Sequence, residues 1–177
     1  MAGMTLRAAT RSDAAAILAI ANPIIRDSLV TFTNCERTLA ETEAEIAGAD
    51  GRFLVCENDG TVCGFASFGP FRNGPGYAHT AEITINLAPV VRRKGLGRAL
   101  LNRLEQTALD RGMHVLVAGI SSANPGAVAF HRAMGYAQVG LMPQVGHKNS
   151  KWLDLVLMQK ILAQVDHDAP DTTVGAE

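Results

Sequence analysis

The sequence has few cysteines, few aromatic residues and no excess of charge of either sign. Its three cysteines, Cys35, Cys56 and Cys63, lack metal-ligand spacing and are odd in number, which favours reduced thiols in a cytosolic protein over a disulfide framework. Lys and Arg number 16 and Asp and Glu 17, so the overall charge gives no indication of nucleic-acid or membrane binding. The five histidines are dispersed, and we expect no metal site.

Long apolar runs are also missing. No stretch approaches the roughly 20 apolar residues of a membrane-spanning helix, and residues 1–11 contain no apolar segment typical of a signal peptide. The chain is nevertheless 47% hydrophobic over 177 residues, which is enough to fill the core of one domain. We expect a single domain over residues 1–163 and a polar, disordered tail over 164–177.

Capping boxes and hydrophobic periodicity predict an alternation of strands and helices. Thr10 with Asp13, and Thr38 with Glu41, are typical helix starts, and Asn22-Pro23 is expected to end or bend the first helix. Strands are predicted over 4–9, 53–57, 61–68, 79–87, 114–120, 136–141 and 152–159, and helices over 10–22, 41–49, 95–111 and 124–134. The economical packing of this order is a mixed α/β sheet with helices on both faces.

The strongest local signal is the run Arg92-Arg93-Lys94-Gly95-Leu96-Gly97-Arg98, which follows a strand and opens a helix. Glycines allow the backbone to approach a ligand closely, and the first amides of a helix are free donors. With the positive end of the helix dipole, this run predicts an anion site suited to a pyrophosphate. The alternative is a basic helix start with two incidental glycines, and spacing alone does not decide between the two.

The same run, as Arg92-x-x-Gly95-x-Gly97, resembles the pyrophosphate loop of the GNAT N-acetyltransferase superfamily. A second stretch, Asn124-x-x-Ala127-x-x-x-His131-x-x-x-Gly135-Tyr136, resembles the other GNAT signature, in which the asparagine contacts the cofactor arm. Further segments are similar to the phosphinothricin and methionine sulfoximine or methionine sulfone acetyltransferase branch: 69–72, 77–82, 114–120 and 142–159. The resemblance spans residue 6 to about residue 162.

The resemblance implies a GNAT-like fold and acetyl-CoA as co-substrate. The expected fold is a central, twisted, mostly antiparallel sheet with one splayed parallel strand pair and helices on both faces. The cofactor-binding residues that it implies are Ile85, Asn86, Leu87, Arg92, Arg93, Lys94, Gly95, Leu96, Gly97, Arg98 and Asn124. Of these, the first three are expected along the pantetheine arm.

The resemblance also implies direct acetyl transfer within a ternary complex. Glu82 matches the family's glutamate and is expected to take the proton that a substrate ammonium must lose, either as a more basic carboxylate or through a water. The alternative is a strand glutamate that simply faces solvent. His131 stands where many members have tyrosine and is a candidate to protonate the departing thiolate. Its alternative is a helix histidine without a chemical role.

On the acceptor side, the resemblance implies binding by Phe32, Arg72, Tyr77, Thr80 and Lys148. An arginine fork suits a carboxylate or a phosphinate, so we expect a small amino-acid-like acceptor with an acidic group. For Trp152, core or dimer packing explains the residue as well as a role in the acceptor pocket does. Asn86 stands where the close family usually has an aromatic residue, which leaves the acceptor's identity open. The family also implies a homodimer.

Two other functions remain open at this point. A protein or peptide N-acetyltransferase would need an open groove, whereas the 69–76 loop and the 142–152 hairpin are expected to form walls. A non-catalytic acyl-CoA-binding module would keep Gly95 and Gly97 but has no need of Glu82.

Overall fold

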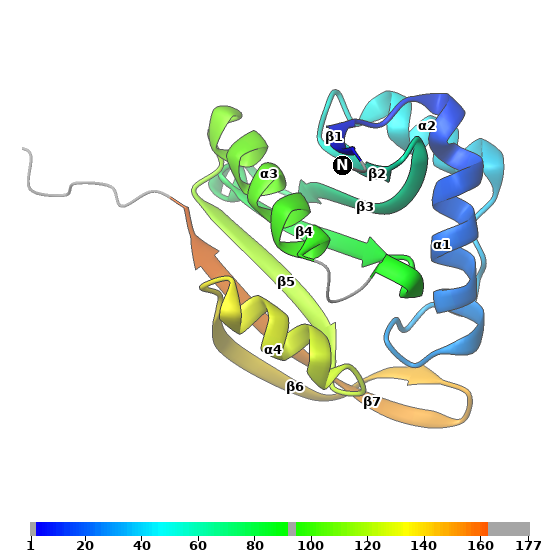
Figure 1. The fold of residues 1–177 in the computed structure, drawn as a ribbon. Coiled ribbons are helices and arrows are strands. Elements are labelled where there is room, and N and C mark those ends of the chain that lie inside the picture. The colour runs from blue at the N-terminus through cyan, green and yellow to red at the C-terminus, as the bar shows by residue number, and fades with distance from the viewer. Residues whose placement is uncertain (1–2, 92–94, 163–177) are drawn as a thin grey trace, which may run out of the picture.

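The computed structural model describes residues 3–91 and 95–162. Within them the chain forms seven strands and four α-helices (Figure 1): β1 (Met4–Ala8), α1 (Ala14–Asp27), α2 (Leu39–Gly48), β2 (Phe53–Asn58), β3 (Thr61–Pro70), β4 (Thr80–Leu87), α3 (Leu96–Asp110), β5 (Val115–Ser121), α4 (Pro125–Ala133), β6 (Ala137–Lys148) and β7 (Lys151–Ile161). The order of strands and helices is the one that the sequence predicts. No helix in the described part of the chain is long and apolar enough to cross a membrane.

All seven strands belong to one sheet, in the order β1-β2-β3-β4-β5-β7-β6. Neighbours are antiparallel except β4 and β5, which run parallel and pair only at their starts, from Thr80↔Val115 to Glu82↔Val117. Beyond that point β4 continues to Leu87 and β5 to Ser121, and the two strands separate toward their carboxyl ends (Figure 1). The predicted splayed parallel pair is confirmed.

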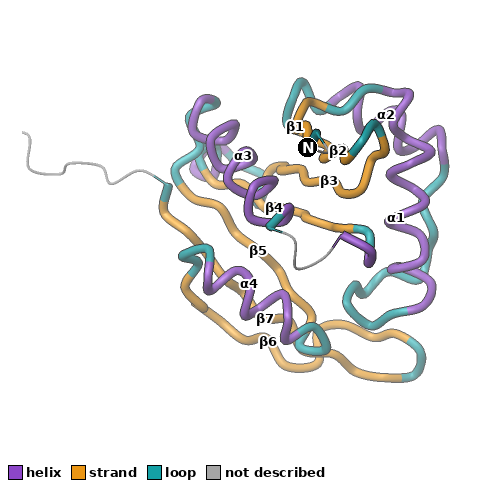
Figure 2. The backbone as a smooth tube through the Cα atoms, in the orientation of Figure 1, coloured by secondary structure: helices purple, strands orange, loops and turns teal. Residues whose placement is uncertain are grey.

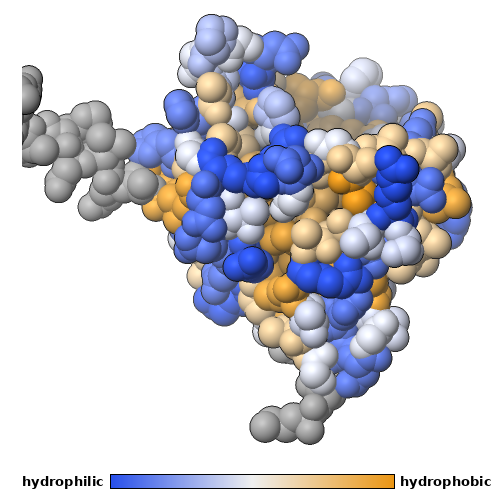
Figure 3. Space-filling view, turned by 90° about the horizontal axis from the view of Figure 1, so that it is seen from above, coloured by the Kyte–Doolittle hydropathy of each residue, from blue (hydrophilic) through white to orange (hydrophobic). Residues whose placement is uncertain are grey.

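The sheet has a core on each face because alternate strand residues point to opposite sides. On β2, Leu54 belongs to the cluster packed under α3, whereas Phe53 and Val55 belong to the cluster packed under α1. Helix α3 contributes the fully buried Leu100 and Leu104 to the first cluster. The helices therefore cover both faces, as predicted. Seen from above, hydrophobic residues lie in small patches among hydrophilic ones (Figure 3).

Of the two predicted alternatives, that Asn22-Pro23 ends the first helix or bends it, the first is wrong, because α1 continues past Pro23 to Asp27. A proline inside a helix removes one backbone hydrogen bond. Contacts outside the helix offset that loss: Ile20 and Ile25 on either side of the proline are buried. The Asn22 side chain also exchanges two hydrogen bonds of 3.0 Å with the backbone of Arg37.

The β6–β7 hairpin is longer than predicted. The sequence predicts that the sixth strand ends at Leu141, yet β6 runs through Pro143 to Lys148 (Figure 2). The register shifts between Gln138 and Gly140 and again between Met142 and Gly146. These irregularities accommodate the proline, which an edge strand tolerates because one side of its ladder is unpaired.

An ion pair stabilises the entry to α1 and yields a prediction on stability. Arg7 donates to both carboxylate oxygens of Asp13, at 2.7 and 2.8 Å, and holds the pKa of Asp13 at about 2. Because this pKa lies below the usual 3.8, the stabilisation is present above pH 3.8 and is lost as the pH falls through 2.

We expect Asp13→Asn to lower the free energy of unfolding by about 1–2 kcal/mol at pH 7. The difference from wild type should shrink as the pH falls from 4 toward 2. Thermal unfolding followed by circular dichroism would measure both. Asp27→Asn is the control, because its partner Arg26 and Asp27 itself are both more than half exposed. Equal losses in the two variants at pH 7 would contradict the prediction.

Candidate active site

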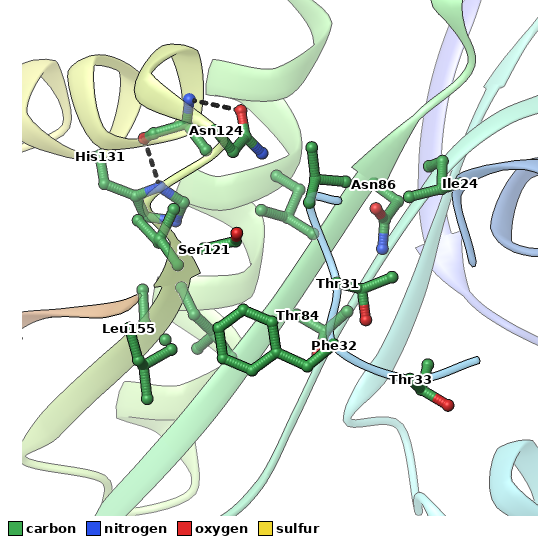
Figure 4. A pocket seen from close by; sticks show the side chains of 17 residues that line it. Ile24, Thr31, Phe32, Thr33, Thr84, Asn86, Ser121, Asn124, His131 and Leu155 are labelled. Atoms are coloured by element: carbon green, nitrogen blue, oxygen red, sulfur yellow. Dashed lines mark hydrogen bonds between the residues drawn. The ribbon is translucent and has the colours of Figure 1, made fainter. Parts of the chain in front are cut away.

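A cavity of about 400 Å³ opens where β4 and β5 separate (Figure 4). Its lining comes from 83–86 of β4, 118–121 of β5, the start of α4 and the segment 30–33 after α1. Because the strands no longer bond to each other here, their edges are available to an extended ligand, as an unpaired strand edge is. The gap is thus shaped to take a linear molecule between two strands.

A second hollow follows one face of β4. Every second residue of a strand points to the same side of the sheet, and on β4 this places together Glu82, Thr84 and Asn86. Thr84 lines the first cavity and two others, of about 500 and 300 Å³, and Glu82 lines the larger of these together with Arg52. These two cavities form a trough along β4, which adjoins the first cavity at Thr84.

The Glu82 carboxylate lies over Gly119, at the end of the paired stretch of β4 and β5. A Cβ atom at Gly119 would come within 3.0 Å of Glu82 Oε1. Glu82 is exposed and pairs with Val117, two residues before Gly119. The missing side chain at Gly119 therefore leaves the space that the carboxylate uses, beside both the strand gap and the trough.

His131, on α4, is buried and lines the first cavity. Its Nδ1 lies 2.9 Å from the carbonyl oxygen of Ala127, and since a carbonyl only accepts, Nδ1 carries the proton. Nε2 is buried and has no hydrogen-bond partner among the described residues. Burial lowers the pKa of His131 and favours the neutral ring, whose Nε2 is then an acceptor.

Asn124 caps the start of α4 at the mouth of the same cavity (Figure 4). Its Oδ1 accepts a hydrogen bond of 3.1 Å from the Ala127 amide, as an N-cap side chain does. Since the oxygen serves the cap, the side chain presents its amide donors at the cavity in the strand gap. The predicted cofactor contact of Asn124 stays a prediction.

The start of α3 packs tightly beside the gap. Gly95 precedes the helix with a φ of +80°, which glycine adopts without strain. A Cβ at Gly97 would come 3.1 Å from Leu87 on β4 and 3.5 Å from Phe130 on α4. Leu96 is buried and Arg98 exposed. Arg92, Arg93 and Lys94 lie outside the described residues.

The predicted acceptor residues fall in three places. Arg72, Tyr77 and Thr80 border a cavity of about 440 Å³ that adjoins the Glu82 cavity through Arg52. Phe32 lines the cavity in the strand gap. Lys148 is 1% exposed, and its ammonium donates to two backbone carbonyls. Lys148 therefore touches the wall of the cavity from behind.

Several residues of the site escaped the sequence analysis. Gly119 interrupts an otherwise apolar strand, and a glycine in that setting signals the close approach of another group. Thr84 follows Glu82 by two positions and so shares its face of β4. Arg52 and Ser121 gave no signal, because only the fold brings them to the cavities.

The chain is 39% identical over 174 residues to the L-methionine sulfoximine/L-methionine sulfone acetyltransferase of Salmonella typhimurium. The aligned region covers 95% of this chain and 99% of the Salmonella protein. The sequence model of the Acetyltransferase (GNAT) family matches residues 22–136. The chain belongs to the GNAT acetyltransferase family.

Two solved GNAT structures contain the co-substrate. The yncA protein of Salmonella typhimurium, solved with its cofactor acetyl-CoA, superposes with a TM-score of 0.87 at 37% identity and covers 96% of this chain and 99% of its own. A phosphinothricin acetyltransferase of Sinorhizobium meliloti in complex with acetyl-CoA gives 0.84 at 31% identity, with coverage of 96% and 97%. This GNAT protein is an acyltransferase that uses acetyl-CoA and acts on amino groups.

The contact between Glu82 and Gly119 yields a prediction on activity. Gly119→Ala would place a methyl group 3.0 Å from Glu82 Oε1, so the carboxylate must move by a few tenths of an ångström. With Glu82 as the base proposed below, a shift of this size should lower kcat by up to about 10-fold, because misplacement by 1 Å costs about 100-fold. Gly140→Ala on β6 is the control, since its Cβ would meet Leu157 at an ordinary 3.7 Å. Equal activity of the two variants would contradict the prediction.

Proposed function

We propose that this enzyme acetylates the amino group of a small amino-acid-like molecule such as methionine sulfoximine, methionine sulfone or phosphinothricin. The observation that carries the proposal is the position of Glu82, whose carboxylate lies between the strand gap and the trough. Arg52 lines the trough beside it, and Arg72 borders the adjoining cavity. The names of the similar acetyltransferases support the same class of acceptor.

The residues of the gap fit acetyl-CoA. The close contact of Gly97 with Leu87 brings the amino end of α3 against β4. Free amides at a helix start, with the dipole, suit a pyrophosphate. Asn124 offers amide donors, and Ile85 and Asn86 line the opposite wall. Acetyl-CoA supplies an activated thioester to this site.

We further propose that transfer is direct, within a ternary complex. The substrate ammonium loses a proton to Glu82, directly or through a water, and the free amine attacks the thioester carbonyl. A new C–N bond forms, the C–S bond breaks, and coenzyme A leaves as a thiolate, whose thiol has a pKa near 8.5. The nitrogen loses a second proton as the neutral amide forms. His131 Nε2 is an acceptor in the neutral ring, so it can take this second proton and pass it to the thiolate.

A homodimer is the oligomeric state that we propose. Strand β6 lies at the edge of the sheet. It exposes Val139, Leu141, Met142 and Val145, and Trp152 on β7 is 64% exposed. Exposed apolar residues gathered on one edge strand mark an interaction surface. Light scattering coupled to gel filtration should give twice the 18.7-kDa chain mass, whereas a monomer mass would reject the dimer.

Release of the CoA thiol tests the acceptor class. The panel contains L-methionine sulfoximine, L-methionine sulfone, phosphinothricin, the common amino acids, a polyamine and a peptide with a free amino terminus. The proposal predicts the highest kcat/KM with one of the first three. Intersecting initial-velocity lines would support a ternary complex, and parallel lines would indicate an acetyl-enzyme. Turnover with the peptide alone would reject the proposed acceptor class in favour of peptide acetylation.

A further inference from the structure

The segment 28–33 follows α1 without regular secondary structure. Its residues 30–33 line the cavity in the strand gap, and Thr31 and Thr33 also line the cavity of about 300 Å³ in the trough, so the segment borders both the acetyl-CoA gap and the acceptor side. Two side chains from other elements hold its backbone. Ser121, at the end of β5, donates to the Leu29 carbonyl at 2.7 Å. Lys148, at the end of β6, donates to the Thr31 carbonyl at 3.1 Å and to the Ile25 carbonyl at 2.5 Å. The segment is therefore fixed from the hairpin and the strand, across more than ninety residues of sequence.

The buried ammonium of Lys148 is the unusual member of this arrangement. It is 1% exposed, and among the described residues it forms no ion pair. Its acceptors are neutral carbonyls, of which Ile25 O belongs to the last turn of α1, where the helix dipole favours a cation. Burying a charge with neutral partners is costly, so general stability alone is a poor reason for a lysine here.

Phe32 makes the second contact between this segment and the hairpin. A Cβ at Gly146 on β6 would lie 2.6 Å from the Phe32 ring, so the ring packs directly on the backbone there. The same ring lines the cavity and projects toward its middle (Figure 4). In Figure 2 the tip of the β6–β7 hairpin lies next to the connection between α1 and α2. The missing side chain at Gly146 thus leaves the space that the Phe32 ring occupies next to β6.

We propose that the β6–β7 hairpin sets the size of the acceptor pocket. The Phe32 ring packs on the backbone at Gly146, and Lys148 holds the segment that contains Phe32. Phe32 is then the residue that limits the acceptor side chain, and Lys148 is a positioning residue that acts through it. The inference rests on the proposed function for its kinetic consequence. Its structural consequence, the anchoring of 28–33, does not depend on which acceptor is used.

A series of acceptors of increasing length tests the size limit. S-methylcysteine sulfone, methionine sulfone and ethionine sulfone differ by single methylene groups. Gly146→Ala forces the ring away from β6 and into the cavity, so we expect kcat/KM for ethionine sulfone to fall at least 10-fold more than for S-methylcysteine sulfone. Phe32→Ala should shift the preference toward the longest member. Gly140→Ala, also on β6, should leave the order unchanged.

A double-mutant cycle tests the role of Lys148. Lys148→Met should raise the KM for the acceptor about 10-fold or more while the KM for acetyl-CoA changes less than 2-fold. In the Phe32→Ala background the same substitution should have less than a 3-fold effect, because its path to the acceptor is gone. Effects that multiply in the double variant would overturn the assignment of Lys148.

Hydrogen–deuterium exchange of residues 28–35 provides the readout that is independent of activity. Lys148→Met and Ser121→Ala should each raise exchange of this segment at least 10-fold, with exchange in α3 unchanged. Ser121→Ala keeps the test valid if Lys148→Met does not fold. If the wild type turns over no sulfone, the proposed function fails, and exchange alone decides the anchoring. If turnover is normal but neither the size order nor the exchange responds, the inference is wrong.

Discussion

Glu82→Gln is expected to lower kcat by about 10²- to 10⁴-fold, the usual contribution of a general base. Glutamine keeps the size and the hydrogen-bonding shape of the side chain, and the space above Gly119 accommodates it equally well. It cannot accept a proton at neutral pH, so the substrate amine would stay an ammonium. Steady-state kinetics with saturating acetyl-CoA would measure the loss.

Acetyl-CoA affinity gives the second readout of Glu82→Gln and should remain within 2-fold of wild type, because the carboxylate faces the trough beside Arg52. Asp110→Asn is the control, an exposed carboxylate at the far end of α3. A Glu82→Gln enzyme as active as this control would remove Glu82 from the chemistry and leave it as a solvent-facing strand residue.

The other large effect concerns the start of α3. Gly97→Val would insert a branched side chain where a single Cβ already comes 3.1 Å from Leu87 and 3.5 Å from Phe130. Overpacking of this kind costs about 1–3 kcal/mol and would push the amino end of the helix away from β4. We expect acetyl-CoA binding, measured by isothermal titration calorimetry, to weaken by about 10- to 100-fold.

Ala133→Val is the matched change for Gly97→Val, at an exposed position on α4, and should leave the dissociation constant within 2-fold. Circular dichroism of both variants would establish that they fold. Unchanged acetyl-CoA affinity in folded Gly97→Val would show that the amino end of α3 takes no part in binding.

Local signals were sufficient to predict most of the fold. The capping box of Thr38 and Glu41 predicted α2, and the structure shows both of its reciprocal hydrogen bonds. Helix α1 was predicted too short because Pro23 is a local signal, whereas the buried isoleucines and the bonds between Asn22 and Arg37 that offset it come from tertiary structure. The length of β6 was missed for the same reason, since its bulges depend on pairing with β7.

The residues of the site also fall into two groups: those that local sequence motifs indicate, and those that only the tertiary structure brings together. Gly97, Asn124 and His131 could be proposed because they lie in motifs that resemble the GNAT signatures. The position of Lys148 could not, because its partners at Ile25 and Thr31 lie 123 and 117 residues away. Sequence patterns identify which residues a strand or helix presents, and only the folded chain determines which distant backbone a buried ammonium meets.

The central claim is that the enzyme acetylates a small amino-acid-like amine. It is tested most directly by offering acetyl-CoA with equal amounts of L-methionine sulfone and a peptide with a free amino terminus, followed by mass spectrometry of both. The account predicts one added acetyl group on the sulfone, on its α-amine, and none on the peptide within the same time. Acetylation of the peptide with an unmodified sulfone would contradict it.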